Sequence, residues 1–378
     1  MEVYPLFGAV SPAIFFSLIV AISFICSWLL TKLLMPTAIR IGLIDMPGGR
    51  KHHKHITPVV GGIAIYLALW ISVFFLASIG VVYRPAIVLL VFGGALVAVG
   101  AADDRFDLNP IIRLIVQLGI AMLAAYYADI KIEELGALFS PASVTLGAVA
   151  IPFTMLAVVG SINAVNMVDG LDGLMSCLTS VILVLLMVSA WVGGSSPSVL
   201  VLLATLLGVV LGFFVHNGRF GRNSRARAFM GDAGSMFLGF VIAYLLIKLT
   251  QDPDPVITPV TTVWLFALPL CDTLRLMIQR MLRRRSPFRA DRLHLHHILR
   301  RAGLTVNQTV LTMAFLQILL GVCGLVGLYV GTPEWVMFYS FLAVFGLYYW
   351  WTMRASRFVR RRKRRVKGFR GGEAVQRA

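Results

Sequence analysis

Three short segments combine carboxylates with glycine or asparagine, and each borders a long apolar stretch. They read Asp103-Asp104-Arg105-Phe106-Asp107, Asn166-Met167-Val168-Asp169-Gly170-Leu171-Asp172-Gly173 and Gly231-Asp232-Ala233-Gly234-Ser235. A carboxylate at the edge of a bilayer is costly unless it binds something, so this much acid in an apolar chain indicates a shared cation. Threading the apolar stretches through a membrane places all three segments on one face. That arrangement favours an enzyme that handles an anionic, phosphorylated substrate.

The adjacent pair Asp103 and Asp104 is suited to a divalent ion. Neighbouring carboxylates either raise one another's pKa or share a cation, and Mg²⁺ prefers hard oxygen ligands with phosphate completing its shell. The alternative is helix N-capping by Asp107 or Asn109 before Pro110. Capping does not account for Asp103 and Asp104, which end the preceding apolar stretch.

The second segment predicts a polar helix face. Two sets of its residues are spaced three or four apart: Asn163, Asn166 and Gly170, and Asp169, Asp172 and Gly173. At that spacing one face of a helix presents amide and carboxylate oxygens together. A polar seam between helices is the alternative, although two Asn and two Asp within ten residues exceed what packing needs.

The third segment places Asp232 at the expected start of a helix. Gly-Asp-x-Gly-Ser at that position offers backbone N–H groups to an anion, while the carboxylate can hold a bridging cation. Simple capping of the helix by Asp232 explains the segment equally well when it is taken alone.

Two basic segments supply the complementary charge. The first carries Arg50, Lys51 and His53 between glycine and proline turns, and the second is Arg289-Ala290-Asp291-Arg292-Leu293-His294-Leu295-His296-His297. Arginine offers paired donors to phosphate and lysine a mobile point charge, so the second segment is predicted to be a cationic clamp for a diphosphate. A topological role for the first segment and a zinc site in the second are the alternatives. Asp272 is expected to be structural, pairing with Arg275.

The elements that must position these residues are membrane helices. The chain has 378 residues, 58% hydrophobic and only 13% charged, which is typical of a polytopic membrane protein. Apolar stretches long enough to span a bilayer occur at 13–35, 58–82, 85–101, 111–128, 145–160, 170–192, 198–215, 229–250, 257–279, 306–330 and 335–353. The expected fold is therefore all-α with about eleven transmembrane helices, comprising a membrane domain at 1–353 and a basic cytoplasmic tail at 354–378.

Charge distribution gives the expected orientation. Alternate loops hold 29 of the 34 Lys and Arg residues, so the N-terminus is predicted outside and the C-terminus in the cytoplasm. The net charge of +17 is concentrated in these loops, without a basic groove or interleaved aromatic residues, which argues against a nucleic-acid partner. The four cysteines lie scattered in apolar stretches and indicate no metal or redox site.

In their order and on their common face, these motifs resemble the polyprenyl-phosphate N-acetylhexosamine-1-phosphate transferase superfamily, the glycosyltransferase 4 family. The resemblance spans about residues 41–305. His294-Leu295-His296-His297 is similar to the His-hydrophobic-His-His signature of the WecA/TagO branch, which uses UDP-GlcNAc. The MraY branch, which takes UDP-MurNAc-pentapeptide, carries a run of three histidines at that place.

The resemblance implies a role for each motif. Asp232 and Asn166 would bind Mg²⁺, with Mn²⁺ as the alternative. The implied catalytic residues are Asp103, Asp104, Asp169, His294, His296 and His297. The implied substrate-binding residues are Arg50, Lys51, His53, Arg113, Asn163, Asp172, Phe229 and Arg292, of which Phe229 and Asp172 would contact the uracil.

The implied reaction transfers GlcNAc-1-phosphate from UDP-GlcNAc to undecaprenyl phosphate. It gives undecaprenyl-diphosphate-GlcNAc and UMP, the first step of a cell-envelope polysaccharide of the O-antigen, common-antigen or teichoic-acid type. The expected location is the bacterial inner membrane with the active site facing the cytoplasm, and the sequence leaves open whether the chain forms a homodimer. Rival interpretations are an MraY-like transferase and a lipid-linked sugar transporter. A transporter would place its carboxylates near the middle of the membrane rather than at helix ends.

Overall fold

The structure is a computed structural model that describes residues 11–45, 56–81, 85–139, 141–220, 225–286 and 293–375, with side chains up to residue 356. Helices make up almost all of it. The first seven are α1 (Pro12–Ile41), α2 (Gly61–Ser78), α3 (Pro85–Phe106), α4 (Pro110–Tyr127), α5 (Ala150–Val168), α6 (Leu174–Val192) and α7 (Pro197–Asn217). The remaining six are α8 (Gly231–Gln251), α9 (Pro259–Leu265), α10 (Ala267–Leu282), α11 (Leu295–Ala302), α12 (Val306–Tyr329) and α13 (Glu334–Val375).

Most of these helices are long and apolar enough to cross a membrane. Within the described residues ten single helices meet that condition, and the bent pair α9 and α10 raises the number to eleven if it counts as one span. The expectation of an all-α polytopic membrane protein is therefore confirmed. Proline at the first position begins α1, α4, α7 and α9, where its missing N–H costs no hydrogen bond.

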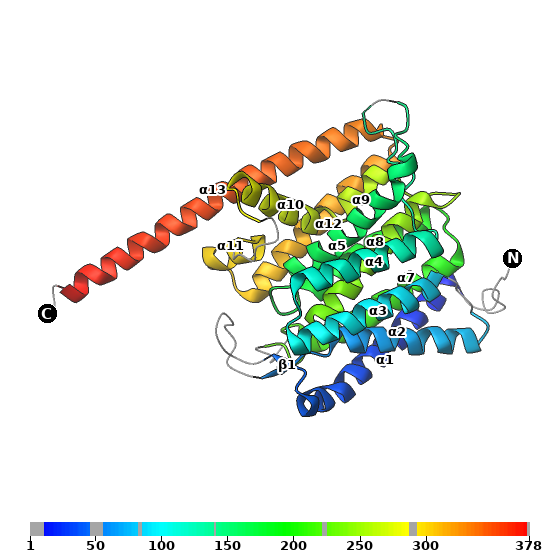
Figure 1. Cartoon of the computed structure of the whole chain (residues 1–378), viewed down its shortest axis with the longest axis horizontal. Coiled ribbons are helices and arrows are strands. Elements are labelled where there is room, and N and C mark those ends of the chain that lie inside the picture. The colour runs from blue at the N-terminus through cyan, green and yellow to red at the C-terminus, as the bar shows by residue number, and fades with distance from the viewer. Residues whose placement is uncertain are drawn as a thin grey trace.

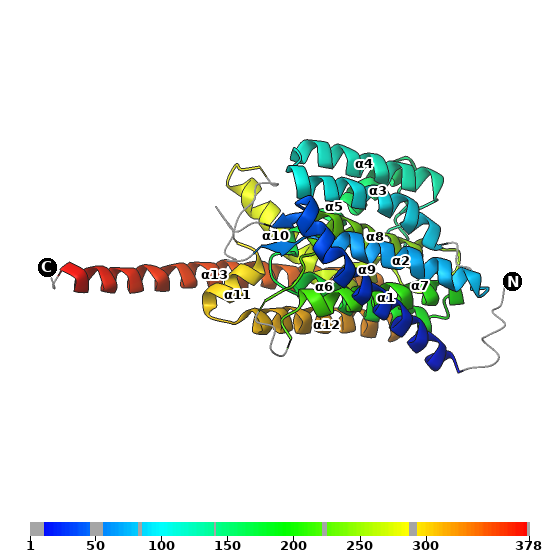
Figure 2. The ribbon, with the colours of Figure 1, turned by 90° about the horizontal axis from the view of Figure 1, so that it is seen from below.

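α8 forms the centre of the bundle. In its span 83% of the residues are buried within the protein, against 17% for the span of α13, which lies at the edge. Glycine allows two neighbours to approach its backbone: a Cβ at Gly100 of α3 would lie 2.4 Å from Ala233 Cα, and one at Gly239 would lie 2.5 Å from Ile162 Cα of α5. This close packing holds the ends of α3 and α5 beside the start of α8. Figure 2 shows α3 and α5 beside α8 in the bundle.

A two-stranded antiparallel sheet lies at the same end of the bundle. β1 (Ile44–Asp45) pairs with β2 (Thr57–Pro58), and Phe229 N donates to Pro58 O at 2.9 Å. The sheet thus ties the first loop to the segment that leads into α8. Arg50, Lys51 and His53 belong to this loop and lie outside the described residues.

The apolar stretch 257–279 does not form the single straight span that its composition predicts. α9 and α10 meet at an angle of 84°. Pro269 has no backbone N–H and excludes a regular helix over the preceding turn. Gln317 of α12 satisfies the groups that the break frees, because its Oε1 accepts from Leu268 N at 3.0 Å and its Nε2 donates to Leu265 O at 2.8 Å.

The chain begins and ends its bundle at opposite ends. α1 starts at the end away from β1 and α11, whereas α13 extends past the end where β1 and α11 lie (Figure 1). Eleven crossings, with α9 and α10 counted as one span, would produce this arrangement. α13 also continues without a break through residues 353 and 354, where the sequence suggested that a separate tail begins.

Candidate active site

Asp104 joins the first and third acidic segments. The first backbone N–H groups of a helix have no partner within it, and at α8 Asp104 supplies the acceptors. Asp232 N donates to Asp104 Oδ1 at 2.8 Å and Ala233 N donates to Asp104 Oδ2 at 3.1 Å. A carboxylate in this position is also stabilised by the helix dipole. Asp104 therefore caps α8 from a neighbouring helix and fixes where Asp232 lies.

Asp103 faces α4 instead. Its buried carboxylate forms an ion pair through Oδ2 with Arg113 Nη1 and accepts from Leu108 N at 2.8 Å through Oδ1. Arg113 Nη1 also lies 3.7 Å from Asp232 Oδ2. A single guanidinium thus bridges the first and third acidic segments.

Asn109 caps the N-terminus of α4, which is one of the two capping alternatives that the sequence offered. Asn109 Oδ1 accepts from Ile111 N at 2.9 Å at the start of α4. Asp107 is exposed and has a positive φ of 52°. Asp107 therefore belongs to the turn and does not cap α4.

Asn166 brings the second acidic segment to the same place. It lies in the last turn of α5, and its Nδ2 donates to Asp232 Oδ1 and to Ser235 Oγ, the latter at 2.8 Å. Its Oδ1 has no partner among the described residues. Asn166 and Asp232 are therefore adjacent, with the amide nitrogen of Asn166 facing the Asp232 carboxylate.

The prediction that Asn163–Gly173 forms one helical face is wrong. α5 runs beyond the predicted limit of residue 160 and ends at Val168, and a turn separates it from α6. Gly173 has φ +77°, a conformation that suits glycine at the start of α6. Asn163 faces α4, where its Nδ2 donates to Gln117 Oε1 at 3.0 Å, and no described hydrogen bond joins it to the acidic cluster formed by Asp103, Asp104, Asp169 and Asp232.

Asp169 lies in this turn, close to the other carboxylates. Burial, with smaller contributions from Asp232, Asp104 and Asp172, raises the pKa of Asp169 to about 7. A carboxylate with this pKa is only partly ionised at neutral pH. An additional cation in the cluster would favour its charged form.

Asp172 lies on the other side of the turn with partners of its own. Its Oδ2 accepts from Arg219 Nε at 2.8 Å and from Ala226 N at 3.0 Å. Asn217 connects this turn to the segment before Phe229, since its Oδ1 accepts from Gly173 N at 3.0 Å and its Nδ2 donates to Ala228 O at 3.0 Å. Sequence analysis overlooked Arg219 and Asn217. The basic character of their loop was attributed to topology alone.

The three histidines differ from one another. His296 is 1% exposed, stacks on His294 at 5.7 Å between ring centroids and contacts His297 at 4.2 Å. Burial, followed by the nearby His297 and His294, lowers the pKa of His296 to about 3. A pKa this far below neutrality means that His296 adds no positive charge to the predicted diphosphate clamp.

His296 also links its loop to the second acidic segment. A Cβ built on Gly170 would lie 2.4 Å from His296 Nε2, so the buried imidazole rests directly against that glycine. Arg292, assigned with the histidines to diphosphate binding, lies outside the described residues.

Comparison with known proteins places the chain among membrane transferases. The sequence profile of glycosyl transferase family 4 matches residues 86–250. Undecaprenyl-phosphate alpha-N-acetylglucosaminyl 1-phosphate transferase of Salmonella typhi is 37% identical over 335 residues, covering 87% of this chain and 90% of that protein. The proteins of the same name from Escherichia coli K12 (35% over 340 residues, 88% and 90%) and Pasteurella multocida (34% over 350 residues, 92% and 97%) are also similar. The chain belongs to glycosyl transferase family 4.

The family 4 profile covers the acidic cluster but not the histidines. Residues 86–250 include α3, α4, α5 and the start of α8, which supply Asp103, Arg113, Asn166 and Asp232. The basic segment that carries the three histidines, residues 289–297, is called the His loop and follows this region. The similarity to the whole-length relatives continues beyond it, since these cover 87% or more of the chain.

The oxygen donors of this family 4 chain fit a hard cation. Among the described residues no group of three or more His, Cys, Asp or Glu is already arranged as a metal site. The described part of the cluster nevertheless brings together the Asp232 carboxylate, the Asn166 amide and the Asp169 carboxyl, and Arg113 is a cationic side chain beside Asp232. Carboxylate and amide oxygens are donors that Mg²⁺ accepts.

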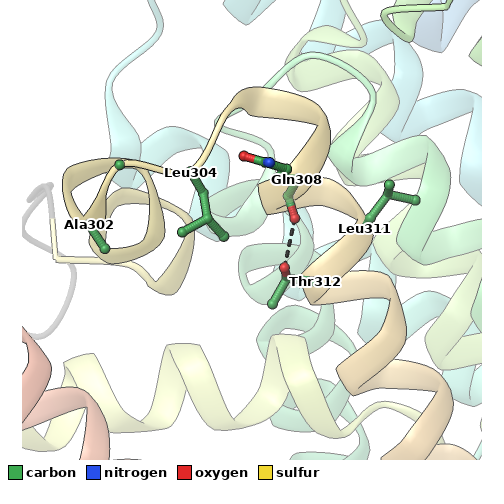
Figure 3. A pocket seen from close by; sticks show the side chains of 6 residues that line it. Ala302, Leu304, Gln308, Leu311 and Thr312 are labelled. Atoms are coloured by element: carbon green, nitrogen blue, oxygen red, sulfur yellow. Dashed lines mark hydrogen bonds between the residues drawn. The ribbon is translucent and has the colours of Figure 1, made fainter.

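A separate open hollow of about 600 Å³ lies where α11 meets α12 in this family 4 fold. It is lined by Ala302, Gly303, Leu304, Gln308, Leu311 and Thr312. In Figure 3, Thr312 donates to the backbone oxygen of Gln308 at 2.7 Å. None of these lining residues is charged or belongs to the acidic cluster, so the hollow has no cationic side chain in its lining to receive a phosphate.

Proposed function

We propose that the chain transfers N-acetylglucosamine 1-phosphate from UDP-GlcNAc to undecaprenyl phosphate. The product is undecaprenyl-diphosphate-GlcNAc, UMP leaves, and the reaction begins the assembly of a cell-envelope polysaccharide. The observation that carries this proposal is the meeting of Asp104, Asn166 and Asp232 at one end of the bundle, in a chain similar over most of its length to proteins named for this reaction.

The chemistry requires two anions to approach each other. An oxygen of the lipid phosphate forms a bond to the β-phosphorus of the nucleotide, and the bond from that phosphorus to the bridging oxygen of UMP breaks. The attacking phosphate has a second pKa near about 6 and is already largely ionised at neutral pH. Neutralisation of charge is therefore the main requirement, with less need for a strong general base. Arg113, positioned by Asp103, is suited to receive one of the phosphates.

Asp232 and Asn166 are the residues that would hold Mg²⁺, with Asp169 close by. When bound, this ion would neutralise developing charge on the phosphate oxygens. Asp104 keeps Asp232 at the start of α8 through its two backbone hydrogen bonds. Mn²⁺ has similar ligand preferences and would fit the same oxygen donors.

The same proposal includes an orientation. The cluster end of the bundle, where β1 and α11 lie, would face the cytoplasm of a bacterial inner membrane, because the basic loops lie at this end. The N-terminus would then lie outside and the C-terminus inside. A polyprenyl chain remains in the hydrocarbon in this arrangement while its phosphate reaches the helix ends.

Replacing Phe229 with alanine is expected to raise KM for UDP-GlcNAc by about tenfold with little change in kcat, because base–aromatic stacking contributes about 1–3 kcal/mol. Phe229 is half-buried and fixed by β2, close to the turn that carries Asp172. Steady-state kinetics with saturating lipid phosphate test this. An unchanged KM would remove Phe229 from the nucleotide site.

Gly170→Ala is expected to lower kcat by about tenfold or more, because its methyl group would overlap the buried His296 ring and displace it. Gly160→Ala is the matched control, since nothing lies within 4 Å of a Cβ at Gly160. Initial rates of both purified variants decide the matter. Equal rates for the two variants would show that the position of His296 does not affect turnover.

The Mg²⁺ concentration for half-maximal activity is expected to rise about tenfold from pH 8 to pH 6, because a proton on Asp169 competes with the cation. With a pKa of about 7, Asp169 is mostly ionised at pH 8 and mostly protonated at pH 6. Magnesium titrations at the two pH values provide the measurement. In Asp169→Asn the dependence should become weaker, and an unchanged dependence in that variant would assign it to other carboxylates of the cluster.

The function itself is tested by incubating membranes that contain the protein with radiolabelled UDP-GlcNAc and undecaprenyl phosphate. We expect UMP and a lipid-soluble diphosphate sugar. A parallel reaction with UDP-MurNAc-pentapeptide distinguishes the MraY-type substrate. Lipid product from the pentapeptide and not from UDP-GlcNAc would contradict the proposed donor.

A further inference from the structure

A buried network outside the acidic cluster holds the His loop in place. Asp272 of α10 has no exposed surface and accepts four hydrogen bonds from three elements. Oδ1 accepts from Arg275 Nη2 at 3.1 Å, Leu295 N at 3.1 Å and Tyr348 Oη at 2.8 Å. Oδ2 lies 2.8 Å from His294 Nδ1.

These contacts exceed what the sequence pairing of Asp272 with Arg275 requires. The ion pair between these two fully buried side chains is present, but it accounts for only one of the four contacts of the Asp272 carboxylate. Leu295 N is the first backbone donor of α11, so Asp272 also fixes the start of that helix. Tyr348 brings α13 into the same network. Asp272 thus connects the C-terminal helix to the loop that carries the histidines.

The contact with His294 determines which nitrogen carries its proton. A carboxylate only accepts hydrogen bonds, so Nδ1 must be the protonated nitrogen and Nε2 remains for other contacts. Among the described residues Nε2 has no partner. His294 in turn stacks in parallel on His296, with an interplanar angle of 8°, and His296 rests against Gly170 beside Asp169.

We propose that Asp272 is a positioning residue that acts through His294. It keeps the imidazole in the Nδ1–H form and directs Nε2 toward the diphosphate region beside the second acidic segment. This inference rests on the proposed function, because it concerns the same reaction. An aspartate that orients a histidine in this way contributes to turnover without touching the substrate.

A change of Asp272 alone would leave Arg275 as a buried, unpaired charge, so the test uses the double variant Asp272→Asn/Arg275→Met, which contains no buried charge. The carboxamide still accepts from Leu295 N and Tyr348 Oη, but its N–H₂ now faces His294 Nδ1 and forces the opposite tautomer. We expect kcat to fall by roughly 10²- to 10⁴-fold while KM for UDP-GlcNAc stays within about threefold. Recovery of wild-type kcat in the double variant would overturn the proposal, because a purely charge-balancing role predicts that recovery.

A mutant cycle tests whether Asp272 acts through His294. Adding the double change to His294→Ala is expected to cost no further activity, because the group through which it acts is already missing. If the two losses multiply, the residues act independently and the proposal fails. The wild-type protein is assayed in parallel. If wild-type protein made no lipid product, the proposed function itself would fail, whereas an active wild type with an active double variant overturns only the positioning role.

A measurement on the unaltered protein completes the test, and a variant is needed only to assign the signal. The chain contains 7 histidines, so ¹⁵N-histidine labelling with His294→Gln as the assignment control can resolve His294. We expect the ring nitrogen shift of a protonated Nδ1. An unprotonated Nδ1 would exclude the carboxylate contact as the device that sets the tautomer.

Discussion

Asp232→Ala is expected to lower kcat by about 10³-fold or more while the protein still inserts and folds. The carboxylate lies at the start of α8, where Asn166, Arg113 and the Asp104-capped backbone converge on it. The substitution removes a carboxylate that would hold the cation and thereby help to neutralise the phosphates. The helix retains its cap because Asp104 bonds to the backbone of residues 232 and 233.

Asp107→Asn is the matched control. It removes a carboxylate only three residues from Asp104, yet Asp107 is exposed and its positive φ is tolerated by asparagine. Steady-state rates and thermal unfolding are measured for both purified variants. The control is expected to keep wild-type kinetics. Substantial turnover by a folded Asp232→Ala protein would refute the role assigned to that residue.

Removal of divalent ions is expected to reduce activity by at least about 10²-fold, and added Mg²⁺ should restore it. In the described part of the chain, the acidic cluster brings Asp103, Asp104, Asp169 and Asp232 together beside Arg113, and a bound cation would offset the repulsion between these carboxylates and the phosphates. Dialysis against a chelator, followed by titration with Mg²⁺ or Mn²⁺, tests this requirement. Full activity in excess chelator would contradict it.

Asn166→Ala sharpens the same experiment. Loss of a single neutral ligand weakens cation binding and leaves Asp232 in place, so the Mg²⁺ concentration for half-maximal activity should rise about 10- to 100-fold. High Mg²⁺ should therefore rescue Asn166→Ala but not Asp232→Ala. Rescue of both variants, or of neither, would show that the two residues do not share a cation as proposed.

Much of this arrangement was predictable from the sequence because bilayer thickness fixes helix length. The apolar stretches predicted the membrane helices, and the positions of Asp103, Asn166 and Asp232 at their ends predicted that these residues would meet. The pairing of Asp272 with Arg275 is likewise confirmed. These predictions depend on local composition and on the fact that successive helices cross the bilayer in alternating directions.

Breaks within apolar stretches were not predictable in the same way. In the sequence, the helical spacing of polar residues continues from Asn163 to Gly173. In the structure, α5 ends at Val168 and a turn that contains Asp169 and Gly170 separates it from α6. The bend between α9 and α10 depends on Gln317, a residue of a later helix whose side chain replaces the missing backbone bonds. Such compensation arises from tertiary contact, which composition does not reveal.

The roles of the histidines also depend on tertiary contact. His296 is neutral because it is buried against Gly170, and His294 is oriented by Asp272 from a helix more than twenty residues earlier. Sequence spacing presents both simply as members of a basic loop. The charge counted in a sequence can therefore differ from the charge in the folded site, because burial and neighbouring groups shift pKa values.

The most direct measurement follows the β-phosphorus of the donor. Purified protein is incubated with Mg²⁺, undecaprenyl phosphate and UDP-GlcNAc labelled with ³²P at the β-position. Transfer of sugar 1-phosphate places the label in the lipid fraction and releases unlabelled UMP in equal amount. Label recovered as UDP in the aqueous phase, with sugar alone on the lipid, would contradict the proposed phosphoryl transfer.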